Sequence, residues 1–222
     1  MMGGNEATLR AGLKILALDL SDAQVRQLLC YQDLIGKWTK VYNLTAVRDP
    51  AEMLTHHLLD SLAAVVPLQK HLLSLGSEGW EMVKPKLLDV GSGAGLPGVV
   101  FAICCPTLLV TCVDTVGKKA AFIKQAALSL GLTNLTGLHA RVEIITEPFD
   151  VICSRAFASL ADFTSWSVKA LAQGGVWMAL KGKHPADELA LLPAGVSVFH
   201  VEQLVVPGLD ADRCVVWLKP LS

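Results

Sequence analysis

A glycine-rich turn beside two carboxylates is the segment of this sequence best suited to binding and chemistry. Residues 91–98 read Gly-Ser-Gly-Ala-Gly-Leu-Pro-Gly and follow a short apolar run that ends in Asp89 and Val90. Glycine tolerates positive φ angles and lets a ligand approach the backbone closely. The turn joins a predicted strand to a predicted helix, and open α/β sheets bind ligands outside the carboxyl ends of their strands. We therefore expect a small-molecule site at this edge.

Two classes of ligand fit this turn. Residues 93–98 match the G-x-G-x-x-G pattern of dinucleotide sites, and Asp114 follows about 20 residues later, where it would hold a ribose. Asp89 favours S-adenosylmethionine instead, because a carboxylate there repels a pyrophosphate but suits a ligand that carries an ammonium group. The first glycine after the strand is Gly91, so the dinucleotide pattern starts late, and few residues remain for a separate substrate domain. We expect S-adenosylmethionine to contact Asp89, Gly91, Gly93, Gly95 and Asp114, the last through its ribose hydroxyls.

Composition and charge narrow the class of protein. The 222 residues, 52% of them apolar, predict one sizeable core. Since the formal net charge is only −1, RNA binding has to depend on local basic patches. The six cysteines form no C-x-x-C pair and are predicted to be buried thiols, so we expect no metal site.

The sequence shows no sign of a membrane segment. No signal-peptide pattern opens the chain, and the longest apolar run, residues 99–113, is shorter than the roughly 20 residues that span a bilayer. We expect a soluble, cytoplasmic protein with no membrane partner.

The first third of the chain is predicted to be helical. Apolar residues recur at helical spacing through residues 6–75, and Ser21 has the sequence context of a helix N-cap. Asp49 followed by Pro50 predicts another helix start, and we expect that helix to run to about Val66 and end before Pro67. We therefore expect residues 1–75 to form a helical segment packed on a core of residues 76–222, with a polar loop at 76–86.

From residue 86 onward, short β-rich runs alternate with helical patterns. The predicted strands are residues 86–90, 108–114, 135–139, 149–154, 176–181, 196–206 and 213–218. Alternation predicts parallel strands with helices on both faces. The last two strands are joined by a short turn, which only antiparallel neighbours allow. The expected fold is α/β, a class I (Rossmann-like) methyltransferase layout: a mainly parallel seven-stranded sheet with a C-terminal antiparallel hairpin and an N-terminal helical segment.

Six segments carry a more specific pattern. They are Tyr-Asn-Leu-Thr-Ala-Val-Arg-Asp-Pro at 42–50, His-Leu-Leu-Asp-Ser-Leu at 57–62, the turn from Asp89 to Gly98, Arg-Val-Glu at 141–143, Ser-Arg-Ala-Phe-Ala at 154–158 and Ala-Leu-Lys-Gly at 179–182. Together they resemble the small-subunit ribosomal RNA methyltransferase family RsmG, also called GidB, over roughly residues 25–220. The glycine turn is shared by many methyltransferases, whereas the Asn-Leu-Thr and Ser-Arg-Ala-Phe segments are much more specific.

The resemblance implies an activity and a set of cofactor contacts. Members of this family transfer a methyl group from S-adenosylmethionine to ring nitrogen 7 of a guanine in small-subunit (16S) ribosomal RNA. The implied partner is that RNA or the 30S particle, and neither DNA nor a membrane is expected. Carried over residue by residue, the resemblance implies cofactor contacts from Gly91, Leu96, Val142, Glu143 and Arg155.

The expected chemistry needs no general base. Ring nitrogen 7 attacks with a lone pair and carries no proton, and the chain shows neither a Ser-His-Asp pattern nor a metal-ligand cluster. Arg155 is the expected catalytic residue, placed after the fourth strand beside the reacting pair. It either donates to the oxygen edge of guanine or contacts the cofactor, as the resemblance favours. Phe157 either stacks on the base or belongs to the core.

Basic residues at the ligand edge are the candidate RNA contacts. We expect RNA to meet Arg48, Lys118, Lys119, Lys181 and Lys183, with Lys124 and Arg141 as further candidates. Two other functions compete with the methyltransferase prediction. One is a nicotinamide-dependent oxidoreductase, which Asp89 disfavours, and the other is a non-enzymatic scaffold that has kept a ligand pocket.

Overall fold

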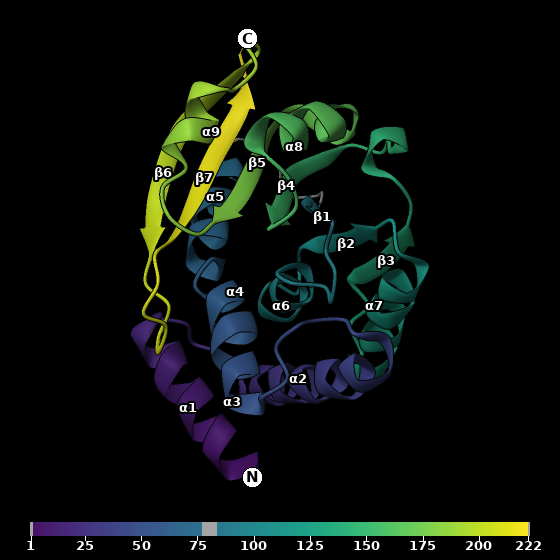
Figure 1. Ribbon diagram of the computed structural model, residues 1–222, viewed down its shortest axis with the longest axis vertical. Helices are drawn as coiled ribbons and strands as arrows, with labels where there is room; N and C mark the ends of the chain where they lie inside the picture. The colour runs from purple at the N-terminus through teal and green to yellow at the C-terminus, as the bar shows by residue number, and fades with distance from the viewer. Residues whose placement is uncertain (1, 77–83, 222) are drawn as a thin grey trace.

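Seven strands form one sheet with helices on both faces in the computed structural model, which describes residues 2–76 and 84–221 (Figure 1). Most of the polar loop expected at 76–86 lies outside the described residues. The helices before the sheet are α1 (Met2–Ile15), α2 (Asp22–Tyr42), α3 (Pro50–Met53), a π-helical turn (Leu54–Leu59), α4 (Asp60–Leu62) and α5 (Val65–Gly76).

The remaining elements alternate between strand and helix. They are β1 (Lys86–Val90), α6 (Gly98–Cys104), β2 (Leu109–Asp114), α7 (Gly117–Leu130), β3 (Leu135–His139), a 3-10 turn (Val142–Ile144), β4 (Phe149–Arg155), α8 (Leu160–Ser167), a 3-10 turn (Val168–Ala170), β5 (Leu171–Lys181), α9 (Ala186–Ala190), β6 (Val196–Leu204) and β7 (Arg213–Pro220). None of the described helices is both long and apolar enough to cross a membrane.

The sheet has the order β3-β2-β1-β4-β5-β7-β6. Strands β1 to β5 pair in parallel, and β7 pairs antiparallel with both β5 and β6. The expected parallel sheet with a C-terminal antiparallel hairpin is confirmed. Parallel neighbours need a helical crossover, whereas the short β6–β7 connection permits only an antiparallel return. Strand β5 begins earlier than expected, at Leu171, and its pairing with β4 shifts register between Phe149 and Val151.

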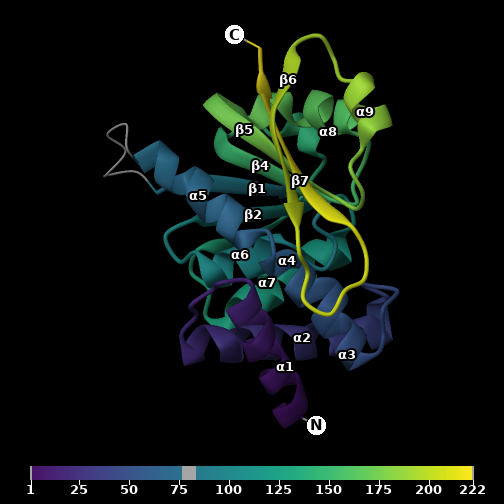
Figure 2. The same ribbon diagram turned by 90° about the vertical axis from the view of Figure 1, so that its left-hand side faces the viewer.

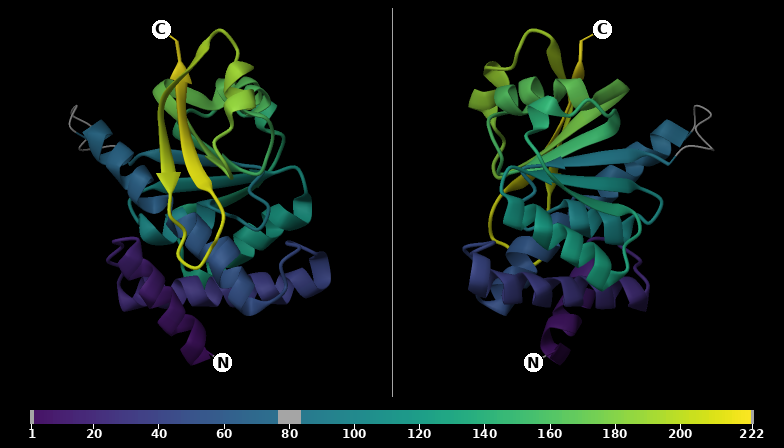
Figure 3. Two further views of the ribbon diagram at one scale, coloured as in Figure 1. Left: turned by 60° about the vertical axis from the view of Figure 1, so that its left-hand side comes forward. Right: turned by 90° about the vertical axis from the view of Figure 1, so that its right-hand side faces the viewer.

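The two faces of the sheet carry separate apolar clusters. Leu28 of α2, Val99 of α6 and Phe122 of α7 belong to the cluster on one face. Leu160 and Phe163 of α8 belong to the cluster on the other. Figure 3 shows these helical layers on either side of the sheet. Because the N-terminal helices share their cluster with α6 and α7, they are part of the main core, and the expected division at residue 75 remains a prediction.

The helices before the sheet begin as expected but end differently. Ser21 forms a capping box with Gln24, and Asp49 caps α3 through the backbone N–H groups of residues 51 and 52. The helix expected to run from residue 50 to 66 is instead divided into α3, the π-helical turn and α4, and Pro67 lies in the first turn of α5. The expectation that Pro67 ends a helix was wrong, because proline fits a first helical turn, where its missing N–H has no partner to lose.

Helix α2 supports the glycine turn directly. The hydroxyl of Tyr31 donates a hydrogen bond to the backbone carbonyl of Ala94 in that turn. Tyr31 is fully buried, and its ring packs against Phe122 of α7 with centroids 6.4 Å apart. A helix from the start of the chain therefore fixes one carbonyl of the turn that follows β1.

We predict that Tyr31→Phe lowers the free energy of unfolding by about 1–3 kcal/mol, because a buried carbonyl loses its hydrogen-bond partner. Urea unfolding measures this. The matched control is Tyr42→Phe, since Tyr42 is 43% exposed, and it should change stability by no more than about 0.5 kcal/mol. Equal losses in the two variants would contradict the supporting role of the Tyr31 hydroxyl.

Candidate active site

Two adjoining cavities open at the carboxyl edge of the sheet. The first has a volume of about 480 Å³ and lies among the π-helical turn, the glycine turn and the ends of β4, β5 and β7. The second has a volume of about 320 Å³ and lies among the ends of β1 and β2 and the Val142–Ile144 turn. Gly91 and Ala156 line both cavities, so they form the border between them. Ala156 holds this place with a φ of +51°, an uncommon conformation for a residue with a side chain.

The glycine turn presents bare backbone to both cavities. Gly91, Gly93 and Gly95 have φ angles of +65°, +57° and +82°, which residues with a Cβ atom rarely adopt. At Gly91 the restriction is also steric, because a Cβ there would lie 2.2 Å from Cδ2 of Phe157. Gly95 points away from the cavities, and a Cβ on it would meet Val99 and the Tyr31 hydroxyl. Gly91 and Gly93 therefore face the cavities, whereas Gly95 packs the turn onto the helices.

Asp114 anchors the far side of the turn. One carboxylate oxygen accepts from the backbone N–H of Gly93 at 3.0 Å, and the other accepts from that of Val116 at 2.8 Å. The ammonium group of Lys119 lies 3.6 Å from the same carboxylate. Asp114 is largely buried yet lines the second cavity, where its remaining lone pairs can accept hydrogen bonds from a ligand.

The rest of the second cavity combines apolar walls with one ion pair. Val142 and Glu143 line it from the 3-10 turn, as their predicted ligand-contact role requires. Glu143 receives a hydrogen bond from Arg141 at 2.9 Å, and its backbone N–H and Arg141 lower the pKa of its carboxyl. Phe157 also lines this cavity and packs edge-on against Trp166, with ring centroids 5.8 Å apart. Phe157 therefore lies over Gly91. It lines the cavity and also packs against the apolar cluster of this face, so both of its predicted roles remain open.

Asp89 lies beneath the turn and lines neither cavity, and its predicted contact with a ligand ammonium group stays a prediction. It is fully buried, and one oxygen accepts from the backbone N–H of Gly98 at 2.9 Å. The other oxygen, Oδ1, has no hydrogen-bond partner among the described residues. Burial raises the pKa of the Asp89 carboxyl to about 7, although the Gly98 hydrogen bond opposes this. Asp89 is buried because the start of α6 packs against it: a Cβ on Gly98 would lie 2.8 Å from the Asp89 carboxylate.

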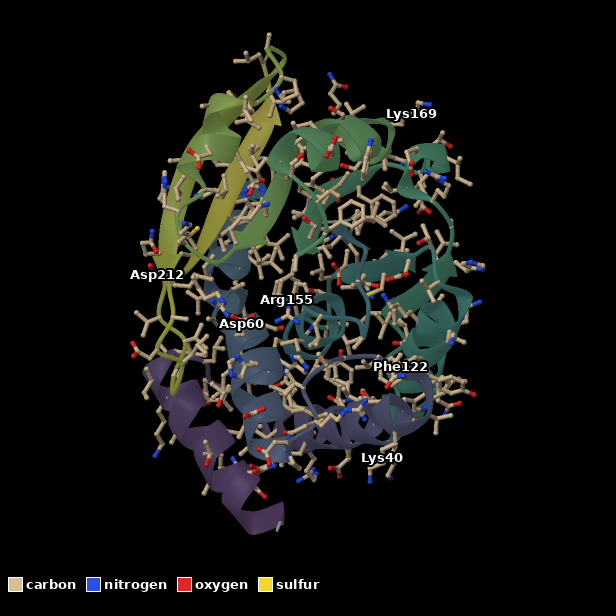
Figure 4. The ribbon with its side chains drawn as sticks, viewed as in Figure 1. Lys40, Asp60, Phe122, Arg155, Lys169 and Asp212 are labelled. Carbon is tan, nitrogen blue, oxygen red and sulfur yellow. The ribbon has the colours of Figure 1, made fainter. Side chains whose placement is uncertain are left out.

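A buried carboxylate joins two arginines in the first cavity. Asp60, at the start of α4, accepts from Nη1 of Arg155 and from Nε of Arg213, each at 2.6 Å. Nη1 of Arg155 also donates to the backbone carbonyl of His56 at 3.2 Å. Figure 4 shows Asp60 and Arg155 next to each other in the middle of the molecule. The predicted catalytic Arg155 is therefore held by an N-terminal helix as well as by its own strand.

A histidine lies in the wall of the same cavity. Nε2 of His57 is 2.8 Å from the hydroxyl of Thr45, and both residues line the cavity. Burial and the nearby Arg155 lower the pKa of the His57 imidazole. The neutral ring is therefore favoured at physiological pH, and the positive charge in this cavity comes from the guanidinium groups and from Lys181.

The candidate RNA contacts fall into two groups. Arg48, Lys118 and Lys183 are exposed, with Arg48 hydrogen-bonded to Asn43 and Lys118 over the Tyr42 ring. Lys119 and Lys181 are instead half-buried and paired with carboxylates, Lys119 with Asp114 and Lys181 with Glu188. The Lys181 ammonium group donates to both carboxylate oxygens of Glu188, at 2.8 and 3.0 Å, and to the Ala158 carbonyl. Lys181 lines the first cavity with its charge paired to Glu188, and its contact with RNA stays a prediction, as does that of Lys119.

The fold brings together segments that looked unrelated along the chain. Five of the six segments that carry the resemblance line the first cavity. One is the glycine turn, and the other four contribute Thr45, His57, Arg155 and Lys181. Sequence reasoning missed Asp60, although it lies within residues 57–62, because a carboxylate inside an apolar helix gives no hint of its partners. It also missed Arg213, for which the sequence offers no signal.

This sheet order, with a glycine turn after β1 and a carboxylate at the end of β2, defines a Rossmann-like protein with the class I methyltransferase fold. Solved structures share it. TrmN from Thermus thermophilus aligns with a TM-score of 0.53 and 22% identity over 76% of this chain and 53% of that chain. A SAM-dependent methyltransferase from Aquifex aeolicus aligns with a TM-score of 0.51 and 19% identity over 77% and 98%. At these identities the likeness concerns the fold alone.

Closer relatives identify the family. The profile of GidB, described as rRNA small subunit methyltransferase G, matches residues 24–216. A ribosomal RNA small subunit methyltransferase G from Polaromonas sp. (strain JS666 / ATCC BAA-500) is 74% identical over 218 residues, which cover 98% of this chain and 95% of that protein. The chain belongs to the rRNA small subunit methyltransferase G family, and the resemblance stated from its motifs is confirmed.

We predict that Gly91→Ala lowers the free energy of unfolding by roughly 2–5 kcal/mol, because strain at positive φ adds to a clash with Phe157. The control is Gly131→Ala at the end of α7, which has the same φ of +65° but nothing within 4 Å of the new Cβ. That variant should lose only about 1–2 kcal/mol. Urea unfolding compares them, and similar losses would show that Phe157 moves aside at no cost.

The raised pKa of Asp89 predicts a pH dependence of stability. The carboxyl has a pKa of about 7 in the folded chain and an ordinary value of 3.8. Between these values the folded state binds the extra proton, so the free energy of unfolding falls as the pH rises through this window.

Relative to that of Asp89→Asn, the free energy of unfolding of the wild type should fall by roughly 2–4 kcal/mol between about pH 4 and pH 7. Urea unfolding across this range measures the difference, and Asp33→Asn, which removes an exposed carboxylate, is the control. A constant difference between wild type and Asp89→Asn would mean that the carboxyl is ionised throughout.

Proposed function

We propose that this protein transfers a methyl group from S-adenosylmethionine to ring nitrogen 7 of a guanine in small-subunit ribosomal RNA. The observation that carries the proposal is the pair of cavities that meet at Gly91 and Ala156. The second offers the Asp114 carboxylate, which suits a ribose, and the first offers the Arg155 guanidinium group, which suits a guanine edge. Family membership supports the small-subunit RNA as the substrate class, since the relative from Polaromonas carries that substrate in its name.

The residues of the second cavity fit the adenosine part of the cofactor. Asp114 presents a carboxylate to the cavity after bonding two backbone N–H groups, so it can accept from ribose hydroxyls. Val142 and Glu143 border the same space and would contact the base. Because Gly91 lines both cavities, a ligand could extend from the second cavity into the first, which Leu96 lines. When bound, the cofactor supplies an electrophilic methyl group on a sulfonium.

The residues of the first cavity fit guanine as the acceptor. Guanine presents two acceptors, O6 and N7, on one edge, and arginine is the commonest specific partner of that edge in DNA major grooves. Arg155 lines the first cavity next to Ala156, which borders both cavities, so it can orient either the base or the cofactor. Nitrogen 7 carries no proton, so no side chain has to remove one, and the neutral His57 is not required as a base. The contribution of this chain is alignment.

Exposed basic residues near the site would contact the RNA backbone. Arg48, Lys118 and Lys183 are exposed and project from separate elements. We infer that they meet phosphates of 16S RNA or of the 30S particle in the cytoplasm. With a net charge of only −1, the protein relies on such local contacts rather than on overall attraction. We also propose that residues 1–75 form a helical segment that packs on a methyltransferase core of residues 76–222.

The test is methyl transfer itself. Purified protein is incubated with tritiated S-adenosylmethionine and small-subunit particles from cells that lack this enzyme, and the label is mapped by nucleoside analysis. Label in 7-methylguanosine supports the proposal. Cofactor binding without that label overturns the acceptor assignment, and binding of a nicotinamide dinucleotide in place of S-adenosylmethionine overturns the cofactor assignment.

We predict that Arg155→Ala reduces methyl transfer by at least about 100-fold, the usual scale for losing a positioned donor at a reacting centre. The control is Arg10→Ala, because Arg10 forms ion pairs with Glu6 and Asp22 on the N-terminal helices and lines neither cavity. It should retain activity within about twofold. Circular dichroism establishes that both variants fold, and full activity of Arg155→Ala would remove Arg155 from the mechanism.

A further inference from the structure

We propose that Arg213 and Arg155, aligned on Asp60, form a binding site for the phosphodiester next to the acceptor guanine. This inference rests on the proposed function, because it assumes that the first cavity receives a nucleotide of RNA. It adds a substrate-binding residue, Arg213, and a positioning residue, Asp60, neither of which touches the second cavity.

The geometry leaves donors free on both arginines. Arg213 uses Nε for Asp60 and Nη1 for the Asp212 carbonyl, at 2.6 and 2.8 Å. Arg155 uses only Nη1, for Asp60 and for the His56 carbonyl. Nη2 of Arg213 and both Nε and Nη2 of Arg155 therefore have no partner among the described residues. A guanidinium group carries five N–H donors in a fixed fork that matches the oxygens of a phosphate.

The charge of the cavity is positive and concentrated at this pair. Arg155, Arg213 and Lys181 line it, but Lys181 is paired with Glu188, and Asp60 offsets one of the two arginines. One net positive charge remains, shared by two guanidinium groups on opposite oxygens of one carboxylate. The Asp60 side chain is only 6% exposed, so this arrangement is held within the wall and does not depend on a surface ion pair. A single anionic group on the ligand would complete the neutralisation.

The position of Arg213 favours the RNA over the cofactor as its ligand. In the sheet, β5 lies between β4, which carries Arg155, and β7, which carries Arg213. Arg155 directly precedes Ala156, which borders the second cavity, whereas Arg213 starts β7 on the other side of β5, whose Lys181 pairs with Cys214. A cofactor that enters from the second cavity through Gly91 would meet Arg155 before Arg213. The group that reaches Arg213 is therefore the outer part of the acceptor nucleotide, its phosphodiester.

The proposed phosphodiester site is built from three separate parts of the chain. Asp60 comes from the helices before the sheet, Arg155 from β4, and Arg213 from the first residue of β7. The β6–β7 connection reaches down to the N-terminal helices, as Figure 2 shows, and a Cβ on Gly208 would lie 3.9 Å from Thr55 of the π-helical turn. This contact brings Arg213 within reach of Asp60. The N-terminal helices thus position both arginines for the substrate.

The experiment compares three ligands with the S-adenosylhomocysteine complex of the full chain by calorimetry: guanosine, guanosine 5′-(methyl phosphate) and guanosine 3′-(methyl phosphate). We expect the wild type to bind one of the phosphodiesters about tenfold more tightly than guanosine, as one charged hydrogen-bonded contact implies. Arg213→Gln should bind all three about equally, with its affinity for guanosine and S-adenosylhomocysteine changed by less than about threefold. Arg10→Gln is the control and should keep the tenfold preference.

Asp60→Asn tests the positioning role separately. Once thermal unfolding shows that it folds, it should lose most of the phosphodiester preference although both arginines remain, and full retention would remove Asp60 from the site. Guanosine binding by the wild type without any phosphodiester preference would overturn the phosphate site but leave the proposed function intact. Loss of S-adenosylhomocysteine binding in Arg213→Gln would assign Arg213 to the cofactor. No binding of any guanosine ligand to the wild type would overturn the phosphate site, whereas the proposed function is overturned only by the absence of label in 7-methylguanosine.

Discussion

The bare backbone of the turn after β1 is the constraint on which the other features of the site depend. A turn with successive positive φ angles stays in place only if its surroundings fix it, because glycine loses more conformational freedom on folding than any other residue. Here Asp89 accepts a hydrogen bond from the end of the turn, Asp114 of β2 accepts one from Gly93, and Tyr31 of α2 donates one to Ala94. Phe157, in the loop after β4, covers Gly91. Elements far apart in the sequence therefore converge on one turn.

The N-terminal helices are part of the site and not an appendage to it. Tyr31 of α2 donates to the glycine turn, and Asp60 of α4 binds Arg155 and Arg213, so both helices hold residues that line the first cavity. Burying a carboxylate is unfavourable unless it is paired and hydrogen-bonded, and two guanidinium groups satisfy that condition for Asp60. The same requirement makes the position of each arginine depend on the other.

Two buried carboxylates in this protein differ because of their neighbours. Asp60 is surrounded by cations, whereas Asp89 faces a backbone N–H, apolar side chains and thiols, and its pKa rises accordingly. The cysteines beside it, Cys112 and Cys153, have their own pKa values raised by burial and by Asp89, so they remain thiols.

Local sequence determined the elements and the turn. Alternating strand and helix patterns predicted the parallel sheet, the short connection predicted the antiparallel hairpin, and the glycines with Asp114 predicted a ligand site at the carboxyl edge, because each depends on residues close together in the chain. Tertiary structure alone decided where Asp89, Lys181 and Asp60 point. The start of α6 covers Asp89 and keeps it out of both cavities, and Lys181 forms an ion pair with Glu188. The fold also brings Asp60 to two arginines from distant strands. Side-chain partners across long sequence separations arise from packing, and no local pattern encodes them.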